Sequence, residues 1–75
     1  KLLKVKAHSN VELMKATYHL GNRHVDLEVH SNEIYLSYDH VLEKLLIHRG
    51  LIVQRLERTF QPENGAYNHT LQIRK

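Results

Sequence analysis

The chain has 75 residues, a net charge of +3 from eleven Lys and Arg against eight Asp and Glu, and no cysteine. A single domain of this size is near the lower limit for folding unaided, and its scattered charges do not demand an acidic partner. Without cysteine there are no disulfides and no thiolate metal ligands, which leaves imidazole, carboxylate and backbone oxygen. Seven histidines make imidazole the most prominent of these groups.

Patterns in the sequence also bear on where the protein is located in the cell and on whether the chain is part of a longer protein. No apolar run approaches the roughly 18 residues that a membrane-spanning helix needs, and no charged-then-apolar leader is present. We therefore expect a cytoplasmic protein that does not bind membranes. Residue 1 is Lys1 rather than Met, and a strand pattern begins at once, so the chain is expected to be a piece of a longer protein.

The first elements are expected to be a strand and an amphipathic helix. The stretch KLLKVKA predicts the strand, and the S-x-x-E spacing of Ser9 and Glu12 predicts a capping box at the start of the helix. We expect Gly21 to end the helix by adopting a positive φ. The helix has a wide apolar arc, made of Val11, Leu13, Met14, Ala16, Thr17, Tyr18 and Leu20, and an opposite polar stripe, made of Glu12, Lys15 and His19. A rival parse makes 11–20 a strand, but the capping box and the polar stripe favour the helix.

From His24 the apolar period changes to two, which is typical of a strand with one buried side. The side expected to be buried consists of Val25, Leu27 and Val29, and the opposite side of His24, Asp26, Glu28 and His30. A tight turn at 31–32 and renewed alternation over 33–38 predict that this strand pairs with the next as a hairpin.

The last predicted elements are a second helix and a final strand. Asp39 is expected to cap a second helix that ends at Gly50, and LIVQRLERTF predicts a final strand. Strand, helix, hairpin, helix and strand predict an α+β fold, the ferredoxin-like βαββαβ sandwich with both helices on one face of an antiparallel sheet. We expect this domain to span 1–60. Residues 61–75 then form either a mobile tail or a hairpin back to 66–73.

Among the histidines, His24 is the strongest candidate for a metal ligand, because it is expected to begin a strand and to point away from the buried side. If two copies meet about a twofold axis near it, one residue supplies two ligands. His69 lies in the tail, from which it can complete the shell. The residues alone give less weight to His19, on the polar stripe, and to His40, in the first turn of the second helix. The remaining three are expected to have structural roles: His8, His30 and His48.

Catalysis is not expected, because the sequence has no cysteine nucleophile, no G-x-S-x-G, no H-E-x-x-H and no glycine-rich phosphate loop. RNA binding would suit a ferredoxin-like sheet with a basic pI. However, only Tyr35 is expected on the outer face, and no RNP run is present, so no nucleic-acid partner is expected. A protein-interaction module with incidental histidines remains the alternative to a metal-binding domain.

Three stretches in order, ATYHLGNRHVDLEV, YDHVLEKLL and GLIVQRLERTFQPENGAY, resemble the C-terminal metal-binding domain of the urease accessory nickel chaperones, the UreE family. The likeness covers about residues 3–67. The resemblance implies a homodimer whose subunits carry an N-terminal peptide-binding domain before this one, and that domain is expected to be missing here. It also implies that His24 binds nickel at the dimer interface together with its twin.

The resemblance assigns further roles. His19 and His40 match positions that serve as peripheral or secondary ligands in some relatives, whereas Tyr38 replaces a histidine that relatives have in the same turn. Many relatives have a histidine-rich tail, where this chain offers His69. The implied function is delivery of nickel(II) for assembly of the urease active site, with the urease maturation GTPase and the apo-urease accessory complex as partners. Imidazole also accepts copper(II) and zinc(II), so these ions are expected to bind in vitro.

Overall fold

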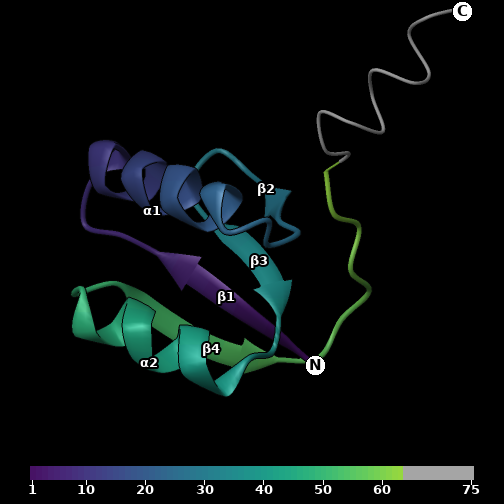
Figure 1. The fold of residues 1–75 in the computed structure, drawn as a ribbon. Helices are drawn as coiled ribbons and strands as arrows, with labels where there is room; N and C mark the ends of the chain where they lie inside the picture. Colours follow the sequence, from purple (N-terminus) through teal and green to yellow (C-terminus); the bar gives the residue numbers. More distant parts are fainter. Residues whose placement is uncertain (64–75) are drawn as a thin grey trace, which may run out of the picture.

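The structure, a computed structural model, describes residues 1–63. Its elements are β1 (Leu2–Lys6), α1 (Asn10–Asn22), β2 (Glu28–Val29), β3 (Ile34–Ser37), α2 (His40–His48) and β4 (Ile52–Leu56). The strands form one antiparallel sheet in the order β2-β3-β1-β4, and both helices cover the same face of it (Figure 1). The predicted ferredoxin-like α+β fold is therefore confirmed. Neither helix of residues 1–63 combines the length and apolar composition that crossing a membrane requires.

The core lies between the helices and the two central strands. Leu3 and Val5 of β1 face the helices, in register with Leu36 and Ile34 of β3, and all four side chains have an exposed fraction of 0%. Burial of a side chain of this size contributes about 1.5–3 kcal/mol. The helices complete the core with Leu13, Leu20 and Leu46. The two-residue period of β1 is therefore what fixes which face of the sheet the helices cover.

Helix α1 begins as the capping box predicts, and the rival strand over 11–20 is wrong. The Ser9 hydroxyl accepts a hydrogen bond from the Glu12 N–H at 3.2 Å, while the Glu12 carboxylate lies 4.0 Å from the Lys15 ammonium. The apolar arc is wider than the face that the core takes up. Its buried members are Leu13, Ala16 and Leu20, whereas Val11, Met14 and Tyr18 are 57%, 67% and 65% exposed.

The hairpin and the second helix also form where they are predicted. Strands β2 and β3 pair antiparallel, and the His30 N–H donates to the Glu33 carbonyl at 2.9 Å across the turn. The Asp39 carboxylate accepts from the Leu42 N–H at 2.9 Å and so caps α2, and Gly50 takes a φ of 87° at the other end. The first strand of the hairpin is shorter than expected, because regular pairing begins at Glu28 rather than at His24.

Burial within β2 is the reverse of the prediction. Glu28 has an exposed fraction of only 6%, whereas Val29 is 44% exposed. Register places Glu28 opposite Tyr35, on the sheet face that the helices do not cover, and that face was expected to be open to solvent. It is not open at this edge, because the chain that follows β4 covers it.

We call residues 57–63, which follow β4, the strap. The Glu28 carboxylate accepts hydrogen bonds from the Gln61 N–H and the Arg58 guanidinium, both at 2.9 Å, and its Oε2 lies 2.7 Å from the His30 Nε2. The Arg58 guanidinium also lies 4.1 Å from the centre of the Tyr35 ring, which removes that ring as a free stacking surface for bases. The strap thus leads from β4, at one edge of the sheet, to β2, at the other (Figure 1).

Acid should weaken the attachment of the strap. The Gln61 N–H, together with His30 and Arg58, holds the pKa of the Glu28 carboxyl below its usual 4.5. A carboxyl whose pKa is lower in the folded state than in the unfolded state stabilises the fold at pH values above its unfolded pKa. This contribution to stability is lost as the pH falls below that pKa. Glu28→Gln should therefore lower the free energy of unfolding at pH 7, and its difference from the wild type should narrow below pH 4.5. Urea unfolding across this range measures both, and a constant difference would contradict the prediction.

Candidate metal site

His24 lies in the turn that closes α1, in a left-handed backbone conformation with φ of 63°. The turn has the hydrogen bonds of a Schellman motif: the His24 N–H donates to the Gly21 carbonyl at 2.9 Å, and the Val25 N–H donates to the Leu20 carbonyl at 3.1 Å. Val25 also packs against the core cluster that contains Leu20, which is the apolar contact typical of this motif. The backbone of His24 is thus fixed from both sides.

The same motif closes α2, with glycine in the corresponding place. The Gly50 N–H donates to the Ile47 carbonyl at 2.9 Å, and the Leu51 N–H donates to the Leu46 carbonyl at 3.1 Å. The prediction that Gly21 takes the positive φ in α1 is wrong. Helix α1 continues to Asn22, Gly21 lies in its last turn, and the left-handed position falls three residues later on His24.

A left-handed conformation costs a residue with a Cβ about 1–2 kcal/mol, and such strain concentrates at functional sites. The sequence offers glycine for this role in α2 but histidine in α1. The expectation that His24 is exposed is confirmed, although His24 lies just after the end of a helix instead of at the beginning of a strand. The turn therefore holds an imidazole at the surface on a well-defined backbone.

The other predicted ligands within the described residues lie exposed on the two helices. His19 is exposed on α1 and packs edge-on against Tyr18, with ring centres 5.4 Å apart. His40 is the exposed first residue of α2. His69 lies outside the described residues. Within residues 1–63, no three His, Asp or Glu side chains lie close enough together to hold a metal ion. A metal ion with three or more side-chain ligands would therefore need ligands from outside this range or from another protomer.

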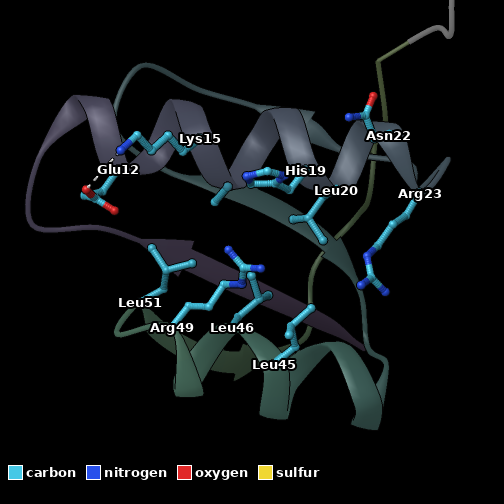
Figure 2. Close-up of a pocket in the computed structure, with 11 residues that line it drawn as sticks. Glu12, Lys15, His19, Leu20, Asn22, Arg23, Leu45, Leu46, Arg49 and Leu51 are labelled. Atoms are coloured by element: carbon cyan, nitrogen blue, oxygen red, sulfur yellow. Dashed lines mark ion pairs between the residues drawn. The ribbon is translucent and has the colours of Figure 1, made fainter.

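A groove of about 350 Å³ separates α1 from α2, and His19 lies on its wall (Figure 2). The floor is apolar and includes Leu20 and Leu46, whereas the rim has three cations and one carboxylate, Glu12, and so has a net positive charge. The rim cations are Lys15, Arg23 and Arg49. The polar stripe of α1 thus borders this groove, which is a surface suited to contact with another molecule.

The sequence does not reveal the contacts that Tyr38, Arg55 and Glu43 make beside the turn before His40. Tyr38 packs against the core, with the Arg55 guanidinium 5.0 Å from its ring centre. Arg55 in turn binds Glu43 through two hydrogen bonds of 2.8 and 2.9 Å, and this pairing lowers the pKa of the Glu43 carboxyl. The turn before His40 is therefore built for packing.

Fold and site together define a small ferredoxin-like domain that presents an exposed histidine at a helix terminus. The family described as the UreE urease accessory protein, C-terminal domain, matches residues 1–74. The chain therefore belongs to the UreE family of urease accessory proteins and corresponds to its C-terminal domain.

Individual relatives agree with this assignment. The urease accessory protein UreE of Synechococcus sp. (strain WH7805) is 58% identical over 66 residues, which cover 88% of this chain and 38% of the relative. The protein of the same name from Acinetobacter baylyi (strain ATCC 33305 / BD413 / ADP1) is 47% identical over 66 residues, covering 88% of this chain and 42% of the relative. The chain thus spans less than half the length of these curated relatives.

Replacing His24 by glycine should stabilise the fold, because glycine adopts φ of 63° without strain. We expect His24→Gly to raise the free energy of unfolding by about 0.5–1 kcal/mol, since part of the relieved strain is offset by the greater freedom of glycine in the unfolded chain. Gly50→Ala is the matched control at the end of α2, and it should lower the free energy of unfolding. Chemical denaturation measures both, and a loss of stability in His24→Gly would show that the side chain itself supports the fold.

Proposed function

We propose that this domain is a nickel carrier, with His24 from each of two protomers as the core of a shared site. The observation that carries the proposal is the left-handed turn, which fixes an exposed imidazole at the end of α1 at a cost in strain that glycine would avoid. Membership of a urease accessory family supports nickel(II) as the cargo and urease active-site assembly as its destination. In this role the domain is a chaperone of the cytoplasm and not an enzyme.

Dimerisation is proposed through the surface next to His24. Val11, Met14 and Tyr18 form an exposed apolar stripe along α1, beside a groove of about 520 Å³ that also includes Val29. Exposed apolar surface of this kind is typical of an interface. A twofold contact near the C-terminal end of this stripe would bury it and bring the two His24 side chains together, so that one residue type supplies two ligands.

The remaining ligands and the choice of metal need further contributions. His69 is proposed to complete the shell from the C-terminal residues, and His19 and His40 are proposed as secondary ligands. Imidazole nitrogen binds copper(II) more tightly than nickel(II) and also accepts zinc(II), so affinity alone does not select nickel. We propose that docking to the urease maturation GTPase and the apo-urease accessory complex supplies the selectivity, with the N-terminal domain of a longer parent protein taking part.

Calorimetric titration with nickel tests the site directly. For the wild type we expect one high-affinity nickel ion per two chains. Both His24→Ala and His24→Gly should lose that ion; the alanine variant keeps the strained left-handed backbone, and the glycine variant relieves the strain. Binding should weaken as pH falls through about 6.5, where free imidazole becomes protonated and can no longer ligate. His8→Ala is the control and should behave like the wild type. Unchanged stoichiometry and affinity in the His24 variants would remove His24 from the site.

Light scattering tests the interface. The wild type should have the mass of two copies when nickel is added. Met14→Glu should shift the mass toward one copy and weaken nickel binding, because burial of a carboxylate in the interface without a partner is unfavourable. Gln54→Glu introduces the same charge on the exposed β4 and should leave the dimer intact. A dimer that tolerates Met14→Glu would place the interface on another surface.

The second candidate function is a protein-interaction module that binds no metal. The groove between α1 and α2 favours it, because an apolar floor with a basic rim suits an acidic peptide (Figure 2). Equilibrium dialysis separates the two functions, since this module would take up no nickel at neutral pH.

A further inference from the structure

The groove between α1 and α2 is a hollow that the core of the domain does not fill. Both helices contribute to its lining, and its volume is about 350 Å³ (Figure 2). Helix α2 supplies Leu45, which is only half-buried and belongs neither to the core cluster nor to the residues packed against it. The floor includes Leu20 and Leu46. An apolar side chain of another molecule would therefore find apolar partners in this groove.

Basic side chains of the groove follow α1 at a regular spacing. Lys15, His19 and Arg23 are four residues apart and all line the groove, with about 6 Å from one to the next along the helix axis. Arg49 comes from the opposite wall, and Figure 2 shows its side chain pointing from the end of α2 into the groove. The positive charges therefore extend along the groove for about 12 Å instead of gathering at one point.

The domain itself balances these charges poorly. Among the described residues that line the groove, Glu12 is the only carboxylate, and it lies 4.0 Å from the Lys15 ammonium. Within residues 1–63, neither Arg23 nor Arg49 has a carboxylate within 4.0 Å, although other arginines of the domain do. Two guanidinium groups at this groove are thus left for a partner.

Both arginines also follow directly after a helix. Arg23 is the C-cap of α1 and Arg49 the C-cap of α2, where a positive charge stabilises the helix dipole. This role explains why the two residues are cationic. It does not explain the charge of Lys15, in the second turn of α1, or the direction of the Arg49 side chain into the groove.

The spread of the charges decides which kind of anion the groove fits. A phosphate group is bound by several donors that converge on one point, whereas these cations lie in a row with apolar surface between them. A protein segment with carboxylates on both sides of an apolar patch matches both properties of the groove. On a helix, carboxylates seven residues apart lie about 10.5 Å apart along one face, which is close to the spacing of Lys15 and Arg23.

We propose that the groove between α1 and α2 is the docking site for an acidic amphipathic helix of another protein. The apolar side of that helix packs on Leu45 and the floor, and its carboxylates pair with Lys15, Arg23 and Arg49. Docking requires no metal ion, so the inference goes beyond the proposed nickel site. Both functions fit in one molecule, because His24 does not line the groove.

A synthetic peptide tests the proposal without metal. The probe is a labelled helical peptide with glutamates seven residues apart and leucines between them, and its fluorescence anisotropy is measured in the presence of EDTA. We expect saturable binding that weakens as salt is added, because salt screens exposed charges. Replacing the glutamates by glutamine, or the leucines by serine, should each weaken binding at least about tenfold. A probe that does not bind, or a glutamine peptide that binds equally well, would overturn the proposal.

Variants of the domain locate the binding surface. Arg49→Glu should weaken binding of the glutamate peptide at least about tenfold, because it replaces an attraction by a repulsion. Lys44→Glu is the matched control, since it makes a like change of charge at an exposed residue of α2 that does not line the groove, and it should weaken binding less than about twofold. Leu45→Ala removes apolar contact outside the core and should weaken binding about threefold or more. Equal weakening by Arg49→Glu and Lys44→Glu would show a response to net charge alone and would overturn the proposal.

Further measurements separate the groove from other sites. Arg23→Glu alters the other end of the groove and should also weaken peptide binding at least about threefold, which keeps the proposal testable if Arg49→Glu does not fold. His24→Ala should bind the peptide as the wild type does, and loss of binding there would place the peptide at the metal site and overturn docking in the groove. Displacement of the peptide by a short oligothymidylate would make the groove a nucleic-acid site and overturn the choice of a protein partner. Because nickel is absent from these titrations, failure of the nickel site and failure of the docking site are observed separately.

Discussion

The left-handed backbone at His24 is the constraint on which the candidate site depends. Two hydrogen bonds of the helix-closing turn, from His24 to Gly21 and from Val25 to Leu20, hold it, and the packing of Val25 on the core prevents its relaxation. The strain is therefore supported by the same apolar contacts that stabilise the fold. A ligand placed in this way has a fixed origin, so its position does not depend on the order of a loop.

The two faces of α1 divide the surface of the domain into different environments. One side presents the apolar stripe of Val11, Met14 and Tyr18, and the other borders the basic groove against α2. His24 follows the C-terminal end of the helix, and its side chain is exposed. A carrier that binds an ion through few nitrogen ligands can release it more readily than a closed four-ligand site can. The separation of apolar and basic surfaces would allow self-association and partner contact to occur without competition.

Much of the fold could be predicted because it depends on local rules. Ser9 and Asp39 are helix caps in the structure, Gly50 takes a positive φ, and the period of β1 identifies its buried face. The predictions fail where contacts between residues far apart in the sequence determine the local structure. The burial of Glu28 depends on Arg58 and Gln61, thirty or more residues away, so no pattern within 24–29 could reveal it. Glycine favours the left-handed conformation, which predicts it at Gly21, whereas in the structure Val25 packs on the core and the left-handed residue is His24.

The attachment of Glu63 to β2 also protects the domain against aggregation through the edge of its sheet. The Leu27 carbonyl and the Val29 N–H point outward from the sheet, and Glu63 occupies both. Left open, such groups form a template on which a strand of another molecule can add, the first step toward amyloid-like stacking. The strap therefore shields this sheet edge, and a chain shortened before Gln61 would lose that protection.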